Sequence, residues 1–175
     1  MKSGYRALED LKKEGSIRAV GLGVNTIGIC EDLLSKIDLD VILLAGRYTL
    51  LEPFQAPPLL ETCRQKGTQL VIGGVFNSGI MATGPVEGAH YDYGPAPRSV
   101  LDRVGAIQEI CDRHDVPLAA AAFRFPGLHE AVACTLVGTA KQTTLSRNLA
   151  QSKLPIPEAV WTDLAAAGLL DMGAS

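Results

Sequence analysis

A short run near the middle of the chain holds the densest group of side chains able to do acid–base or hydrogen-bonding chemistry. His90, Tyr91, Asp92 and Tyr93 follow one another there, and an imidazole with two phenols can move protons or bind a polar ligand. Glycines and prolines bound the run, which is typical of a loop. We predict that this loop is a lid over a substrate, which His90, Tyr91 and Tyr93 contact. A surface loop without a role is the alternative.

A second candidate segment, GGVFNS, precedes this loop and begins at Gly73 and Gly74. Backbone N–H groups from Val75 to Ser78, held in a turn or at a helix start, suit the binding of a pyrophosphate. The alternative is that the glycine pair only lets a neighbouring helix or strand approach closely.

Both segments depend on the elements that carry them, and the chain alternates apolar stretches with amphipathic ones. We expect strands over residues 17–25, 40–51, 68–76 and 132–140, and helices over 5–13, 30–37, 57–67, 99–116, 118–130, 142–152 and 157–170. Apolar strands that alternate with helices imply a parallel sheet covered by helices. Four strand–helix units fit either an open doubly wound sheet or half of a (β/α)8 barrel. The fragment GLG lacks the third glycine of a dinucleotide fingerprint and gives the first option little support.

Composition excludes several classes of function. The 175 residues are 47% hydrophobic and 20% charged, which is typical of a single folded domain. A formal net charge of -3 offers no basic surface for nucleic acid or an anionic membrane. The four cysteines have no metal-ligand spacing, and no apolar run is long enough to cross a membrane. We therefore expect a cytoplasmic protein without a metal, a nucleic-acid partner or a membrane.

Four motifs resemble one enzyme family. They are IRAVGLGVN, LLAGRYTLLE, GGVFNSGIMATGPVEGAHYDY and LVGTAKQTTLSRN, and they are similar to the C-terminal half of an aldo-keto reductase. The resemblance points to the branch that contains L-fucose dehydrogenase, D-threo-aldose 1-dehydrogenase and pyridoxal 4-dehydrogenase. It implies an α/β fold in which residues 1–175 form a single domain. That domain is the C-terminal half of a (β/α)8 barrel plus a C-terminal helix, with the N-terminal half absent.

The same resemblance implies an NAD(P)-dependent oxidoreductase that oxidises an aldose such as L-fucose at C1 to the lactone. The family's catalytic aspartate, tyrosine, lysine and histidine belong to the N-terminal half of the barrel. No catalytic residue is therefore assigned here, and we expect the chain alone to be inactive. A non-catalytic half-barrel that binds the cofactor or serves in assembly is the alternative, and a product that does not fold stably is a third.

Partners follow from the same reasoning. A small sugar or aldehyde is the expected substrate. Four strands taken from a closed barrel leave two parallel edges and the barrel interior uncovered. We expect self-association, or pairing with a missing N-terminal half, to cover them, and a loose fold is the alternative.

The resemblance places cofactor contacts in the loops after the four strands. NAD or NADP is expected, and NAD is favoured because Thr144 stands where many NADPH-preferring members have an arginine that clamps the 2′-phosphate. Lys141 or Arg147 can substitute for that arginine, although Arg147 has the alternative of an exposed helix position without a role. Asn148 is expected to face the adenine. The implied contacts are Asn25, Gly74, Val75, Phe76, Asn77, Ser78, Gly138, Thr139, Lys141, Arg147 and Asn148.

Two positions depart from the family pattern. Gly73 stands where many members stack an aromatic ring on the nicotinamide, and Ala45 stands where relatives often have a glutamine. Arg47 and Tyr48 lie near the end of the second predicted strand and can face the pocket. We expect Tyr48 to contact the substrate, and packing beneath the loop is the alternative.

Overall fold

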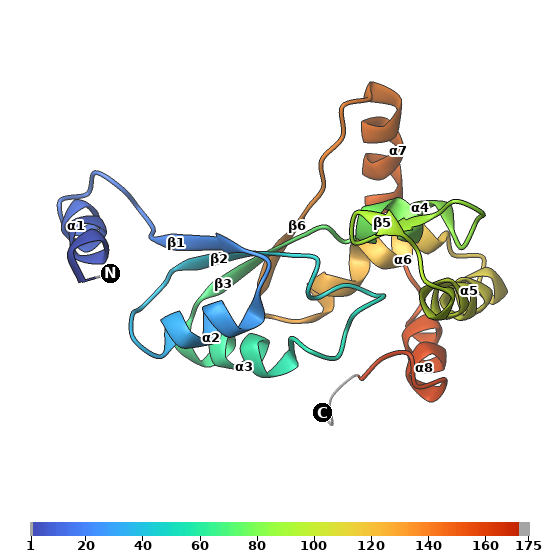
Figure 1. Ribbon diagram of the computed structural model, residues 1–175, viewed down its shortest axis with the longest axis horizontal. Helices are drawn as coiled ribbons and strands as arrows, with labels where there is room; N and C mark the ends of the chain where they lie inside the picture. The colour runs from blue at the N-terminus through green and yellow to red at the C-terminus, as the bar shows by residue number, and fades with distance from the viewer. Residues whose placement is uncertain (1, 172–175) are drawn as a thin grey trace.

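A computed structural model describes residues 2–171 and contains the predicted parallel sheet (Figure 1). Its four strands pair in the order β1-β2-β3-β6, with parallel neighbours throughout. This arrangement confirms four strand–helix units and half of a (β/α)8 barrel. The strands are β1 (Gly21–Val24), β2 (Val41–Ala45), β3 (Gln69–Gly73) and β6 (Val132–Leu136).

Helices connect the strands in the predicted alternation. Helix α3 begins at two prolines and ends at Gly67, whose positive φ of 71° terminates the helix. Helix α5 buries residues at helical spacing, including Val104, Ile107 and Ile110. The helices are α1 (Lys2–Lys13), α2 (Ile27–Leu34), α3 (Pro57–Lys66), α4 (Ile80–Thr83), α5 (Arg98–Arg113), α6 (Leu118–Arg124), α7 (Gln142–Ser152) and α8 (Glu158–Ala166), with 3-10 turns η1 (Asn77–Gly79) and η2 (Phe125–Leu128).

Several predicted elements end earlier than the sequence indicated. The second strand stops at Ala45 because Gly46, with a φ of 69°, turns the chain away from the sheet. The fourth strand stops at Leu136, and α6 passes into η2 at Phe125. The lid segment is also more regular than a loop. It forms a short hairpin of β4 (His90–Tyr91) and β5 (Gly94–Pro95).

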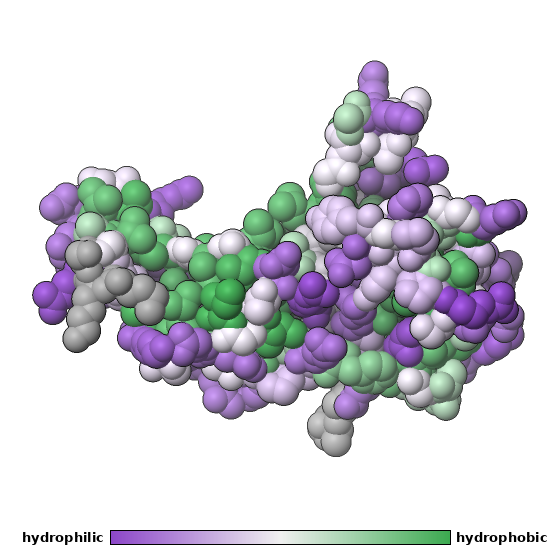
Figure 2. Space-filling model, in the orientation of Figure 1, coloured by the Kyte–Doolittle hydropathy of each residue, from purple (hydrophilic) through white to green (hydrophobic). Residues whose placement is uncertain are grey.

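The two faces of the sheet have different surroundings. On β2, Ile42 and Leu44 are fully buried, whereas Val41, Leu43 and Ala45 on the other face are only partly buried. Helices α2 and α3 lie along one side of the sheet, and the other side faces the hollow between α1 and α7 (Figures 1 and 2). We call this second side the open face. Register and alternation place on it Gly21, Gly23, Val41, Leu43, Ala45, Val71, Gly73, Cys134 and Leu136.

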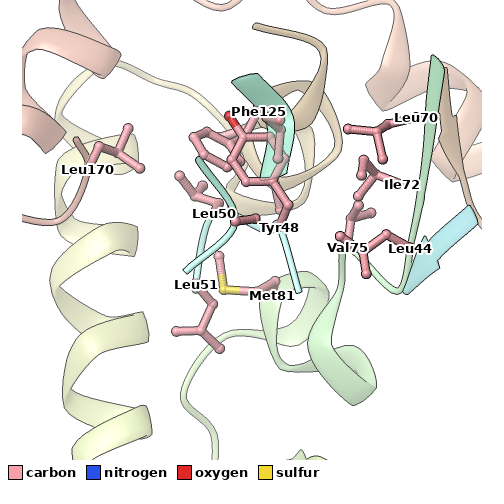
Figure 3. Close-up of a cluster of buried hydrophobic side chains, with 14 of the residues drawn as sticks. Leu44, Tyr48, Leu50, Leu51, Leu70, Ile72, Val75, Met81, Phe125 and Leu170 are labelled. Atoms are coloured by element: carbon pink, nitrogen blue, oxygen red, sulfur yellow. The ribbon is translucent and has the colours of Figure 1, made fainter. Parts of the chain in front are cut away.

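A cluster of buried side chains joins the sheet to the helices of the C-terminal half (Figure 3). The ring of Phe125 lies 4.9 Å from that of Tyr48 and 6.4 Å from that of Trp161, measured between centroids. Tyr48 is only 7% exposed. It therefore packs in the core beneath the loop, which favours the alternative given for Tyr48 over the predicted substrate contact.

The sheet has two unpaired edges. Within residues 2–171, strand β1 pairs only with β2, and β6 pairs only with β3. Helix α1 is tied beyond β1 by the Tyr5 hydroxyl, which donates to the Asp38 carbonyl at 2.7 Å, and by Lys12, whose Nζ lies 2.6 Å from Asp40 Oδ1. Helix α7 projects from the chain beyond β6 (Figure 1). None of the helices within residues 2–171 combines the length and apolar character needed to cross a bilayer.

Candidate functional site

A first hollow lies where the chain leaves β3 and β6. Its volume is about 260 Å³, and it is lined by the backbone turn after β3 together with the residues that end β6. Because parallel strands direct their carboxyl ends to one edge, the two loops meet there. We call this hollow the cradle. Its lining comprises Gly74, Val75, Phe76, Asn77, Ser78, Gly79, Leu136, Val137 and Gly138.

The turn that forms the cradle has an unusual backbone. Gly74, Asn77, Ser78 and Gly79 all have positive φ, at 70°, 44°, 59° and 101°. Successive residues in this region point several N–H groups toward one concave side, which suits an anion. The N–H of Asn77 donates to the Gly74 carbonyl at 3.0 Å, and that of Gly79 donates to the Phe76 carbonyl at 2.8 Å. These two N–H groups therefore close the turn.

Gly74 is required by its surroundings. A Cβ at this position would lie 3.0 Å from the Gly46 backbone nitrogen, and its φ of 70° is strained for a residue with a side chain. The Gly46 N–H also donates to the Gly73 carbonyl at 2.9 Å. The loops after β2 and β3 are thus in close contact. This supports the interpretation that the glycine pair lets a neighbouring segment approach closely, and it is compatible with ligand binding in the cradle.

A second hollow of about 190 Å³ adjoins the cradle and shares Gly74, Asn77 and Ser78 with it. We call it the polar pocket. It gathers residues from the ends of β1, β2 and β3, and its side chains are mostly amides, hydroxyls and charges. Its lining comprises Asn25, Ala45, Gly46, Arg47, Glu52, Gly74, Asn77, Ser78, Tyr91, Asp92 and Tyr93.

Arg47 and Glu52 connect the walls of the polar pocket. The Nε of Arg47 donates to the Asn25 carbonyl at 2.8 Å, so it links the ends of β1 and β2. Its Nη1 lies 3.9 Å from Glu52 Oε2. Glu52 also accepts a hydrogen bond from the Tyr91 hydroxyl. The Glu52 carboxylate therefore contacts both Arg47 and Tyr91. Tyr91 belongs to the hairpin of β4 and β5, which we call the lid hairpin.

The lid hairpin turns at Asp92 and Tyr93, whose φ values are 47° and 66°. Two successive positive φ values at the centre of a two-residue hairpin are typical of a type I′ turn. Burial and the neighbouring Glu52 carboxylate raise the pKa of Tyr91 to about 12. The Tyr91 phenol therefore stays protonated at neutral pH and is a poor general base.

Asn77 has an unsatisfied atom at the boundary between the cradle and the polar pocket. The residue is 8% exposed, and its Oδ1 is buried with no hydrogen-bond partner among the described residues. Buried acceptors in folded proteins are nearly always paired. An N–H or O–H of a bound ligand would satisfy this oxygen.

The structure brings most of the predicted site residues together, and the others lie outside the two hollows. Asn25 lines the polar pocket, as do Tyr91 and Tyr93, although Tyr93 is 96% exposed at the rim. Val75 is fully buried, so only its backbone faces the cradle. His90, Thr139, Lys141 and Arg147 are exposed and line neither hollow, whereas Asn148 on α7 is buried.

Sequence reasoning missed Glu52, and it expected that Arg47 can face the pocket without assigning it a contact. Arg47 follows the glycine that ends β2, and that position was a usable signal because charged residues just after a barrel strand face the site. Glu52 carried no such signal. Its role arises from Tyr91, which lies far away in the chain and reaches it only in the folded molecule.

Comparison with known proteins fits this geometry. The model of the aldo/keto reductase family matches residues 1–168. The chain belongs to this family. It is 42% identical over 167 residues to pyridoxal 4-dehydrogenase of Microbacterium luteolum, and 38% identical over 171 residues to D-threo-aldose 1-dehydrogenase of a Pseudomonas species. These matches cover 95% and 97% of the chain but 49% and 52% of the relatives, so the chain spans about half their length.

Solved aldo-keto reductases share the fold at low sequence identity. The holo form of an enzyme from Bacillus halodurans superposes with a TM-score of 0.74 at 20% identity, over 97% of this chain and 56% of that one. Its apo form gives 0.71 at 21% identity. The aldo/keto reductases are oxidoreductases, and these structural matches show the fold.

Proposed function

We propose that this chain is the cofactor-binding part of an NAD(P)-dependent dehydrogenase that oxidises an aldose, such as L-fucose, at C1 to the lactone. The observation that carries the proposal is the pair of adjoining hollows at the carboxyl ends of the barrel strands. That edge is where barrel enzymes bind their ligands. One curated relative is called an aldose 1-dehydrogenase and the other a pyridoxal 4-dehydrogenase, so both names denote oxidations.

The cradle fits the pyrophosphate of a dinucleotide. The backbone of the turn after β3 lines the cradle, and the turn keeps its shape because Gly74, with a positive φ, packs closely against the Gly46 backbone. When bound, the nicotinamide supplies the hydride acceptor. NAD is favoured over NADP because Thr144 offers no guanidinium for a 2′-phosphate. Lys141 and Arg147, which the proposal assigns to the adenosine end, are exposed, while the burial of Asn148 withdraws its amide from the surface of α7.

The polar pocket fits a small polyhydroxylated substrate. Arg47 is a rigid donor because its Nε is fixed by the Asn25 carbonyl. Glu52 and the lid hairpin close the opposite wall. Hydroxyl groups of a sugar can accept from the guanidinium and donate to carboxylate and amide oxygens, including Asn77 Oδ1.

Neither Tyr91 nor His90 is suited to remove the proton from the oxidised hydroxyl. Burial, together with the hydrogen bond to Glu52, raises the pKa of Tyr91 to about 12 and keeps this phenol neutral. His90 lines neither hollow. This arrangement favours a second function, in which the chain by itself binds the cofactor without turnover. The dehydrogenase activity then needs residues supplied from outside these four strands.

The two functions are separated by one experiment. The chain is joined to the part of Microbacterium luteolum pyridoxal 4-dehydrogenase that lies outside the matched segment. NADH formation at 340 nm is then measured with L-fucose and with pyridoxal. We expect turnover in the fusion and none in the chain alone. A fusion that binds NAD but never oxidises a sugar would contradict the dehydrogenase proposal and favour the binding role.

The cradle itself is tested by Gly74→Val. We expect at least about a tenfold loss of NAD affinity, because the side chain would collide with the Gly46 backbone and displace the turn that forms the cradle. Gly127→Ala is the matched control, since a Cβ at Gly127 has no atom within 4 Å. Titration calorimetry gives both affinities. Equal NAD binding by the two variants would show that the cofactor does not use this turn.

A further inference from the structure

Arg103 is a half-buried side chain of α5 that lines neither the cradle nor the polar pocket. Its guanidinium reaches two other segments of the chain. Nε donates to the Leu51 carbonyl at 2.9 Å, and Nη2 donates to the Leu169 carbonyl at 2.7 Å. Its Cζ lies 5.2 Å from the centroid of the Phe54 ring, which is a cation–π contact. Helix α5, the loop after β2 and the chain after α8 therefore meet at this one side chain.

The charge of Arg103 serves these contacts and not an ion pair. None of the ion pairs found within residues 2–171 involves Arg103. Burial lowers the pKa of Arg103 below its ordinary value, but a guanidinium keeps its charge at neutral pH. Charge-assisted hydrogen bonds to the two carbonyls offset part of the cost of burying it. A lysine has no planar fork and would not reproduce both bonds.

The peptide group between Leu51 and Glu52 is held at both ends. Its carbonyl accepts from Arg103. Its N–H, which belongs to Glu52, donates to the carbonyl of Thr49 at 3.0 Å and to Thr49 Oγ1 at 3.1 Å. Thr49 is fully buried. Because a peptide group is planar, bonds at its two ends fix the orientation of the whole unit. The backbone that carries the Glu52 side chain is therefore fixed from outside the polar pocket.

The place of the Glu52 backbone matters because the carboxylate has two partners in the pocket. It pairs with Arg47 and accepts from the Tyr91 hydroxyl. Hydrogen bonds weaken steeply as they lengthen or lose alignment. A shift of the Glu52 backbone would therefore draw the carboxylate away from one partner or from both.

The end of α8 fixes the other side of the Arg103 guanidinium. This helix stops at Gly168, which has a φ of 70°. The N–H of Leu169 then donates to the Leu164 carbonyl at 2.9 Å, and that of Gly168 donates to the Ala165 carbonyl at 2.9 Å. These two bonds form a Schellman motif, which ends the helix in a defined geometry. The Leu169 carbonyl that Arg103 binds is thus part of an ordered helix end.

We propose that Arg103 is a positioning residue of the polar pocket, which acts through the Leu51 carbonyl to set the place of the Glu52 carboxylate. The chain after α8 belongs to the same support, because the same guanidinium binds it. The positioning needs no ligand, and only the use of the pocket for a substrate rests on the proposed function.

The test is Arg103→Lys, which keeps a charge and a long stem but loses the fork. The reporter is Tyr91, whose pKa is raised to about 12 by burial first and then by its bond with Glu52. We expect this pKa to fall toward its ordinary value near 10 in the variant. A spectrophotometric titration measures it, and Tyr91→Phe identifies the transition.

Arg113→Lys is the matched control, because Arg113 also links α5 to α8, through an ion pair with Asp163 at 3.6 Å. This variant should leave the titration of Tyr91 unchanged. Circular dichroism checks that both variants fold. A folded Arg103→Lys that keeps the wild-type Tyr91 titration, or an equal shift in the control, would overturn the proposal.

A second measurement uses the wild-type chain, so it does not depend on whether a variant folds. Nuclear magnetic resonance follows the exchange of Arg Nε–H protons with water. Arg98 is the reference on the same helix, since its Nε lies 2.9 Å from Asp102 Oδ1 while its side chain is 86% exposed. The Arg103 proton should exchange at least about tenfold more slowly, because its bond is shielded between packed segments. Equal exchange would show that Arg103 does not hold the Leu51 carbonyl.

Activity is measured separately, in the fusion with the unmatched part of Microbacterium luteolum pyridoxal 4-dehydrogenase. Arg103→Lys should raise the KM for L-fucose at least about threefold and leave kcat nearly unchanged, as expected for lost substrate binding. A wild-type fusion that oxidises no sugar would contradict the proposed function. The positioning role would still be decided by the Tyr91 titration.

Discussion

Glu52 is the residue that organises the polar pocket, since it pairs with Arg47 and accepts from Tyr91. A side chain with two partners from two different segments fixes both of them at once. The lid hairpin is therefore attached to the loop after β2 through a single phenol. Opening of the pocket requires that this hydrogen bond break, together with the one from the Tyr93 N–H to Ser78 Oγ at 3.4 Å.

We predict that Glu52→Gln lowers the pKa of Tyr91 from about 12 toward its ordinary value near 10. The neutral phenol is favoured in the fold, so its contribution to stability is complete below pH 10 and is lost as the pH rises through 12. A spectrophotometric tyrosine titration should show the shift, with Tyr91→Phe identifying the transition. Tyr48 also titrates near 12, but through burial alone, and should not move. An unchanged titration in Glu52→Gln would show that the hydrogen bond does not form in solution.

The sequence pattern predicted which amides and glycines belong to the site. It did not predict the side-chain contacts that determine what each residue does. Tyr48 lies near the end of a predicted strand, which suggested that it faces the pocket, yet its ring packs against Phe125 in the core. Asn77 and Ser78 could be placed because they follow β3 directly. Contacts between segments far apart in the chain leave no local sequence pattern. The sequence therefore predicted the loop after β3 as part of the site but did not predict Glu52.

At the scale of elements, α1 depends on a few polar contacts for its position. Asp40 accepts hydrogen bonds from Lys12 Nζ and from the Val20 N–H at 2.8 Å, so it joins α1 to the chain that enters β1 and β2. These hydrogen bonds, that of Lys12 first, lower the pKa of Asp40 below its ordinary value. Because the ion pair is more than a third exposed, its contribution stays below about 1 kcal/mol.

We expect acid to release α1 before the sheet unfolds. A depressed carboxyl pKa contributes stability above the ordinary value near 4, and that contribution is lost as the pH falls through the folded pKa. Amide hydrogen exchange of residues 2–13 should therefore quicken on acidification and in Asp40→Asn at neutral pH. Asp10→Asn is the control, since its contact with Lys13, at 3.9 Å, lies within α1. Equal exchange in the two variants would contradict the role of Asp40.

The order of the elements was predictable and their ends were not. Apolar stretches of β-branched and leucine residues marked all four strands, and parallel order followed from the helices between them. Strand β2 ended early because Gly46 adopts a positive φ, and the lid became a hairpin because Asp92 and Tyr93 do so as well. Asp tolerates a positive φ but Tyr rarely adopts one, so the pair of residues did not predict that turn.

At the scale of the whole molecule, the open face sets the behaviour of the isolated chain. Half of a barrel buries only the side of its sheet that carries α2 and α3, together with the cluster around Tyr48 and Phe125. The barrel interior, normally filled by side chains from all strands, is a surface here. A molecule of this shape exposes apolar area that a closed barrel would not.

We predict that the isolated chain binds the dye ANS while it keeps a helical far-UV circular dichroism spectrum and a cooperative thermal transition. The dye reports exposed apolar surface, and the buried core keeps the secondary structure. The fusion of this chain with the unmatched part of Microbacterium luteolum pyridoxal 4-dehydrogenase should bind several-fold less dye. A dye signal that accompanies a broad transition without cooperativity would show instead a loosely packed state, in which the open face is not a defined surface.

The distribution of the four thiols has a consequence for handling the protein. Cys30, Cys63 and Cys111 are sealed in the core, and Cys134 alone is exposed, at the rim of an apolar surface. In air-oxidised buffer, two chains that meet through this surface can join by a bond between their Cys134 sulfur atoms. Such a covalent dimer would migrate at the mass of an intact aldo/keto reductase without being one. Samples kept under reductant, or carrying Cys134→Ser, remove that artefact.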